Sequence, residues 1–174
     1  MEPILIREAG PADAEFVADM ARRTFIDSFA EHNTAENMRI FLEEQFPKER
    51  QMAEIGAAGR HFLLAYADGE PAGYVSLRVG DPPGELQGEK AIEIVQLYSE
   101  KKMIGKGIGP VLMQAALDLA REKGFDWVWL GVWEHNHRAK AFYQKWGFER
   151  FGEHIFFVGL DAQTDWWMRR KLGE

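Results

Sequence analysis

The sequence predicts an α/β or α+β fold, in which helices cover the faces of one mixed sheet. Segments with strand-like and helix-like hydrophobic spacing alternate in the order strand, helices, three strands, helix, strand, helix and two strands. The composition is that of an ordinary globular protein, because 46% of the residues are hydrophobic and 28% are charged. A length of 174 residues suggests one domain that spans residues 1–174.

The first half of the chain is expected to hold one strand, three helices and a hairpin. These elements cover, in order, residues 4–9, 16–25, 34–46, 49–55 and 61–80. Thr34 is a favourable N-cap for the second helix, and Pro47 stops that helix. Asp68-Gly69 lies between two apolar runs and predicts the tight turn of the hairpin.

The second half alternates strands and helices after a polar loop. The loop covers residues 81–89, and the expected strands and helices cover residues 91–99, 109–124, 125–133, 136–147, 148–159 and 164–172. Gly124 and Gly147 stand where the two helices should end, as glycine does at many helix C-termini.

The charge and the cysteine count exclude several classes of function. A net charge of −7 argues against non-specific DNA binding, which needs a basic surface, and it suits a cationic substrate. The absence of cysteine excludes disulfides and thiolate zinc sites and fits a reducing compartment. Neither a secretory signal nor an apolar run of roughly 20 residues is present, so we expect a soluble, cytoplasmic protein without a membrane partner.

Three glycines, Gly105, Gly107 and Gly109, stand at alternate positions before a helix-like run. Their spacing matches neither the P-loop nor the dinucleotide fingerprint. A strand–loop–helix turn of this kind can instead hold a pyrophosphate such as that of coenzyme A, because glycine allows close approach and the helix N-terminus favours negative charge. Pro110 suits the first helical turn. The loop alone is equally compatible with a turn that binds nothing.

A second motif follows the next expected strand, with the pattern N-x-x-A-x-x-F-Y-x-x-x-G-F from Asn136 to Phe148. Together with LYSEKKMIGKGIG, it resembles the GNAT superfamily of acyl-CoA-dependent N-acetyltransferases. The resemblance implies a mostly antiparallel sheet of about seven strands flanked by helices. The first half and the tail, with G-x-H-x-F-x-x-G and then Q-T-D-x-x-M, also resemble the bacterial spermidine/spermine N-acetyltransferase branch.

The resemblance implies acetyl-CoA as co-substrate and no metal. It also implies that the strand before the glycine loop separates from its neighbour. The pantetheine arm would pair with the free backbone of that strand end at Leu97, Tyr98 and Ser99, where a backbone N–H near Leu97 would face the developing oxyanion. The remaining residues expected to bind the cofactor are Gly105, Lys106, Gly107, Ile108, Gly109, Pro110, Asn136 and Lys145. From the residues alone, Asn136 is as well explained as a helix cap, Lys145 as a solvated side chain and the strand end as core.

The loop departs from the family pattern at its first position. Members usually carry Arg or Gln there, whereas this chain carries Ile104. The backbone N–H groups remain, so we expect the loop to bind acetyl-CoA more weakly, with Lys102 or Lys106 as candidates to compensate.

Two residues are predicted to move protons. Tyr143 is the candidate general acid for the leaving thiolate, and aromatic packing with Phe142 and Trp146 is the alternative. Glu93, in an apolar strand, is the candidate base, directly or through water, and a salt bridge is the alternative. The pair His135 and His137 lacks further ligands nearby, which argues against a metal site.

The predicted reaction is acetyl transfer to a primary amine in a ternary complex, with spermidine or spermine as expected acceptors. The resemblance places the acceptor groove between residues 25–37 and 81–89, where the acidic candidates are Asp27, Glu31, Glu36, Asp81, Glu85 and Glu89. Acetylation of protein N-termini or lysines, and a non-catalytic coenzyme A-binding module, are the alternatives. Homodimers are common in the superfamily, and no local feature of this chain establishes one.

Overall fold

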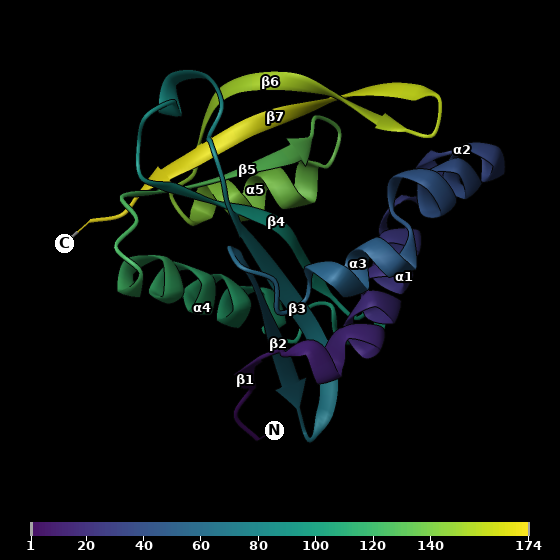
Figure 1. Ribbon diagram of the computed structural model, residues 1–174, viewed down its shortest axis with the longest axis horizontal. Helices are drawn as coiled ribbons and strands as arrows, with labels where there is room; N and C mark the ends of the chain where they lie inside the picture. Colours follow the sequence, from purple (N-terminus) through teal and green to yellow (C-terminus); the bar gives the residue numbers. More distant parts are fainter. Residues whose placement is uncertain (1, 174) are drawn as a thin grey trace.

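The structure, a computed structural model, describes residues 2–173 and is built on one seven-stranded sheet (Figure 1). The strand order is β1-β2-β3-β4-β5-β7-β6. The strands are β1 (Leu5–Glu8), β2 (Arg60–Ala67), β3 (Glu70–Val79), β4 (Ala91–Ser99), β5 (Trp127–Trp133), β6 (Glu149–Val158) and β7 (Asp161–Lys171). Among the strand pairs of residues 2–173, only the β4–β5 pair is parallel. The predicted mixed, mostly antiparallel sheet is therefore confirmed.

Helices cover both faces of the sheet. One face carries α1 (Ala14–Phe29), α2 (Ala35–Ile40) and α3 (Lys48–Glu54), and the other carries α4 (Ile108–Glu122) and α5 (His137–Lys145) (Figure 1). Each face has its own apolar core, because strand side chains alternate between the two sides. None of the helices within residues 2–173 is both long enough and apolar enough to cross a membrane.

The local signals in the sequence act where they were predicted. The Thr34 side chain accepts a hydrogen bond from the Asn37 N–H at 3.1 Å, as an N-cap does. Asp68 and Gly69 form the β2–β3 turn with φ of 51° and 78°, the left-handed conformation of a tight hairpin turn. Gly124 and Gly147 also have positive φ at the ends of α4 and α5.

The second predicted helix is not one α-helix. It is α2 followed by a π-helical turn at Phe41–Gln45, where the Phe46 N–H donates to the Phe41 carbonyl at 2.6 Å. The wider turn keeps Phe41 and Phe46 stacked in the core, with ring centroids 5.4 Å apart. The apolar spacing of the sequence predicted a helix but carried no signal for this insertion.

The sheet opens in its middle. β4 pairs with β5 only from Ala91–Ile94, opposite Trp127–Leu130. From Val95 to Ser99, β4 still lies beside β3 along one edge. Its other edge is no longer paired with β5. The separation that the family resemblance implied is therefore present, and it leaves backbone groups of both strands facing a gap.

The turn between β6 and β7 is fastened to the helices of the first half, and Figure 1 shows this hairpin tip beside α2. The Asn37 side chain accepts from the Leu160 N–H at 3.0 Å, and the Gln45 side chain accepts from the Gly159 N–H at 3.0 Å. Gln163 donates to Asn33 at 2.7 Å. We call these contacts the hairpin clasp. They join segments that lie far apart in the sequence.

Candidate active site

A cleft of about 900 Å³ occupies the place where β4 and β5 separate. Val95–Ser99 and Gly131–Trp133 form its floor, and the glycine loop with the start of α4 forms one side. Helix α5 contributes a second side, and α1, the short turn at Ala30–His32 and the β6–β7 hairpin enclose the rest. The cleft thus collects most of the residues that the sequence singled out.

The glycine loop has room for a bulky anion. Gly105 and Gly107 have φ of 84° and 86°, and a side chain placed at either position would meet no atom within 4 Å. Gly107 is the N-cap of α4, so the free N–H groups of the first helical turn lie at the cleft. Open space beside a helix N-terminus fits a phosphate or pyrophosphate group.

Some cations near this loop line the cleft and others do not, and the cofactor contacts of Lys106 and Lys145 stay predictions. Lys101 and Arg138 line the cleft. Lys102 donates to Glu70 at 2.8 Å, while Lys106 and Lys145 are exposed and are not among the lining residues. Ile104 lines the cleft and is 44% exposed, so an apolar side chain stands where the family usually has a polar one.

Tyr143 projects from α5 into the cleft. Its ring contacts that of Phe148 edge-on, with centroids 5.9 Å apart. Burial raises the pKa of Tyr143 to about 12, so the hydroxyl is protonated at neutral pH. Tyr98 lines the same cleft, and its pKa is raised by burial and by the nearby Tyr143 and Asp165.

Asn136 caps α5, which is one of the two roles that the sequence allowed. Its side-chain oxygen accepts a hydrogen bond from the Ala139 N–H at 3.1 Å. The residue also lines the cleft, so its predicted contact with the cofactor stays a prediction.

Glu93 lies outside the cleft lining. Its carboxylate accepts hydrogen bonds from Arg78 at 2.7 and 3.0 Å, across the β3–β4 pair. Burial raises its pKa while Arg78 opposes that shift. Direct proton transfer from a substrate to Glu93 is not supported by this placement, because β4 turns the side chain toward Arg78. Transfer through water stays a prediction.

A different carboxylate, that of Asp165 on β7, lines the cleft. Burial raises its pKa to about 6. The aspartate belongs to the Q-T-D-x-x-M pattern and had no role assigned from the sequence. Its position directly before the two large aromatic residues Trp166 and Trp167 was the available signal.

The acceptor groove was predicted only in part. Asp27 and Glu31 line the cleft, as expected for residues of its first wall. The loop at residues 81–89 was wrongly placed, because it packs over the other end of β7: Gly84 lies near Trp167, and Glu85 accepts from Arg169 at 2.9 Å. Glu36 is paired with Arg39.

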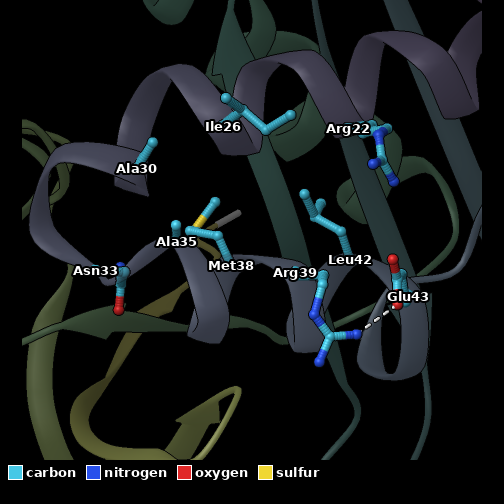
Figure 2. Close-up of a pocket in the computed structure, with 9 residues that line it drawn as sticks. All are labelled: Arg22, Ile26, Ala30, Asn33, Ala35, Met38, Arg39, Leu42 and Glu43. Atoms are coloured by element: carbon cyan, nitrogen blue, oxygen red, sulfur yellow. Dashed lines mark hydrogen bonds and ion pairs between the residues drawn. The ribbon is translucent and has the colours of Figure 1, made fainter.

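A second, smaller hollow of about 460 Å³ lies between α1 and α2 (Figure 2). Its lining is mostly apolar, with Ile26, Met38 and Leu42 facing it. Arg39 is bonded to Glu43 at 2.8 Å, as the dashed line shows. The hollow therefore brings together no candidate nucleophile, base or anion-binding loop, and the larger cleft is the candidate active site.

Comparison with known proteins gives a consistent result. The profile of the Acetyltransferase (GNAT) family matches residues 19–148. An uncharacterised N-acetyltransferase of Lactobacillus delbrueckii subsp. lactis is 40% identical over 91% of both chains. A spermidine N(1)-acetyltransferase of Thermoplasma acidophilum is 27% identical over 84% of this chain and 88% of its own.

A solved structure supports the fold. The PaiA N-acetyltransferase of Thermoplasma acidophilum, crystallised in complex with coenzyme A, superposes with a TM-score of 0.78. The alignment covers 98% of this chain and 99% of that one, at 24% identity.

Proposed function

The chain belongs to the GNAT family of acetyltransferases, and we propose that it moves the acetyl group of acetyl-CoA to a primary amine of a small cationic acceptor such as spermidine. The observation that carries this proposal is the cleft itself. It combines a glycine loop at a helix N-terminus, an unpaired strand edge, a buried tyrosine and an acidic wall.

The residues of the loop side fit coenzyme A. The N–H groups at Gly105, Gly107 and the start of α4 would hold the pyrophosphate, with Lys101 and Arg138 beside it. The free edge of β4 from Val95 to Ser99 offers backbone donors and acceptors to the amide groups of a pantetheine arm. When bound, acetyl-CoA supplies the activated acetyl group as a thioester.

Catalysis by this chain needs an oxyanion donor and a donor to the leaving sulfur. A backbone N–H near Leu97 would stabilise the oxyanion, a contribution typically of about 3 kcal/mol. Tyr143 would donate its hydroxyl proton to the leaving sulfur. The amine must reach the carbonyl carbon of the thioester, which would lie between these two donors. The separation of β4 from β5 therefore sets where the amine can enter.

A cationic acceptor is supported by the opposite wall. Asp27, Glu31 and Asp165 bring three carboxylates to the cleft, whereas the basic residues Lys101 and Arg138 come with the loop and α5. A polyamine carries several ammonium groups along one flexible chain, and each of them can pair with one of these separated carboxylates. The relative named spermidine N(1)-acetyltransferase gives independent, though distant, support for a polyamine.

Release of free thiol from acetyl-CoA tests the proposal, with polyamines, aminoglycosides, amino acids and short peptides as acceptors. We expect spermidine or spermine to give the largest kcat/KM, and uncharged or acidic amines to give much less. If peptides are acetylated and polyamines stay at background, the acceptor assignment is wrong. If acetyl-CoA binds and no amine releases thiol, the chain is a binding module.

A further inference from the structure

One carboxylate in the cleft lacks the partner that a buried charge normally has. Asp165 is only 15% exposed at its side chain. Within residues 2–173, the one basic side chain within 4 Å of it is His154, whose Nε2 lies 3.9 Å from Oδ2 and whose pKa is lowered by burial. That distance is too long for a hydrogen bond, so both carboxylate oxygens keep their acceptor capacity.

Such a group is costly unless something else compensates it. Burial alone raises the pKa of Asp165 to about 6, which means that the site disfavours the negative charge. Glu93 and Glu100, by contrast, pair with Arg78 and Arg23. An unpaired carboxylate in a cleft is therefore a candidate for contact with a cationic ligand.

The surroundings leave space for that ligand. A side chain at Gly131 would stand 3.3 Å from His154 Nε2 and 3.5 Å from Asp165 Oδ2, and the glycine is exposed on the cleft floor. Any larger residue there would cover the carboxylate. Trp133 lines the cleft beside Gly131, next to the ring of Phe29. Aromatic faces attract alkylammonium groups, which adds to the carboxylate's pull.

Asp165 also lies close to the residues assigned to acetyl transfer. Besides burial, Tyr143 and Asp165 both raise the pKa of Tyr98, so the three groups lie in one electrostatic neighbourhood at the end of β4. The unpaired edge of β4 passes through the same place. An amine bound at Asp165 would therefore stand next to the strand edge on which the thioester is expected.

We propose that Asp165 binds the ammonium group of the acceptor and takes up its proton during acetyl transfer. This inference rests on the proposed function and deepens it. The ammonium nitrogen first gives one proton to the carboxylate, which passes it to solvent, and the neutral amine then attacks the thioester carbonyl. As the C–N bond forms and the C–S bond breaks, the nitrogen gives its second proton to the carboxylate. The leaving sulfur gains a proton from Tyr143, which regains one from solvent, so that one proton in total is released to solvent.

Asp165→Asn is the informative variant, because the amide keeps the size of the side chain and loses the base. With spermidine we expect kcat/KM to fall about 100-fold or more, as removal of a general base commonly does. Glu153→Gln, on the same hairpin with an exposed carboxylate, removes one charge and should stay within about twofold of wild type.

The pH profile separates a base from a mere binding charge. For the wild type, kcat/KM should rise with pH through about 6, since the base must be ionised. Other titratable groups face the same space, namely His154 from β6, Tyr98 from β4, Tyr143 from α5, and Asp27, Glu31 and His32 from α1 and the turn after it. Asp165 is not the base if the rise of kcat/KM near this pH persists in Asp165→Asn. The same conclusion follows if Glu93→Gln shifts the pH of that rise and Asp165→Asn does not.

A binding measurement distinguishes this inference from the proposed function. Calorimetry with spermidine and coenzyme A-saturated protein needs no turnover, and Asp165→Asn should weaken spermidine binding at least tenfold. Equal spermidine affinity in wild type and variant would overturn the inference, whether or not acetylation is seen. A third result is that the variant binds spermidine more weakly while the wild type turns over no amine. That result would overturn the proposed function, and the ammonium site at Asp165 would stand.

Discussion

The Tyr143 hydroxyl keeps its proton throughout the pH range in which the enzyme is expected to work, because burial raises its pKa to about 12. A thiol has a pKa of about 8.5, so complete transfer from such a tyrosine to a thiolate is uphill. The hydroxyl therefore first stabilises the negative charge on the sulfur as a hydrogen-bond donor, and its proton passes to the sulfur as the tyrosine regains one from solvent. The profile of kcat should accordingly show no basic limb from Tyr143 below about pH 10.

Tyr143→Phe removes that donor and little else. We expect kcat to fall about 100-fold, while KM for acetyl-CoA changes by less than about threefold, because the ring still fills its place against Phe148. Tyr66→Phe is the matched control, since its hydroxyl accepts from Arg7 at 3.0 Å outside the cleft. Unchanged kcat in Tyr143→Phe, measured by thiol release, would reduce the residue to aromatic packing.

Ile104 offers a test of the loop at the level of one side chain. Ile104→Arg adds a guanidinium at an exposed position of the cleft lining, where it can reach a phosphate. We expect KM for acetyl-CoA to fall about threefold to tenfold at low salt, with the gain shrinking as salt rises. Ile26→Arg, exposed on α1 away from the loop, adds the same charge and should leave KM unchanged.

The hairpin clasp depends on one glycine. At Gly159, φ is 62° and an added side chain would come within 2.6 Å of the Asn37 Cα, which is backbone and cannot easily move. At Gly69, φ is 78° and nothing lies within 4 Å. Both positions carry the conformational cost of a left-handed residue, and only Gly159 adds a clash.

Chemical denaturation of Gly159→Ala and Gly69→Ala isolates that clash. We expect Gly69→Ala to lower the free energy of unfolding by about 1 kcal/mol and Gly159→Ala by about 2–4 kcal/mol. Equal losses in the two variants would mean that the hairpin tip can move away from α2 without cost.

Elements with strong local signals could be predicted from the sequence. Thr34 caps α2 through its side chain, and the Asp68-Gly69 turn and the glycines after α4 and α5 act through their backbone conformation. All of these interactions stay within a few residues of the chain, so the local sequence is enough to predict them. The β4–β5 separation followed from a family resemblance rather than from any residue.

The missed features depend on contacts between distant segments. Glu93 was predicted as a base or as one half of a salt bridge, and its partner Arg78 could not be named because it lies on another strand. The surroundings of Asp165 come from the neighbouring strands β5 and β6. The position of the loop at residues 81–89 depends on its contacts with β7. A one-dimensional pattern contains no information on such pairings.

For the molecule as a whole, the proposed base should reduce stability. A folded-state pKa of about 6, above the ordinary value of 3.8, means that the folded chain binds the Asp165 proton more tightly than the unfolded chain. The free energy of unfolding therefore loses this contribution as pH rises from about 4 through 6. At neutral pH the folded protein carries the cost of an unpaired, ionised carboxylate.

Asp165→Asn should consequently be more stable relative to wild type at pH 8 than at pH 4. We expect the difference to grow by about 1–3 kcal/mol between these pH values, as judged from urea unfolding. Glu153→Gln should show a difference that is independent of pH within about 0.5 kcal/mol. A pH-independent difference for Asp165→Asn would indicate that the carboxylate has an ordinary pKa.

The clasp has a consequence for biosynthesis. A ribosome makes the glycine loop and Tyr143 before it makes β7, yet Gln163 and Asp165 complete the wall that the amine must contact. β7 also lies between β5 and β6, so a chain that stops short of it leaves the β5 edge open. Chains that end before β7 would therefore lack the proposed binding place for the amine, and acetyl transfer to it is expected only once β7 has been added.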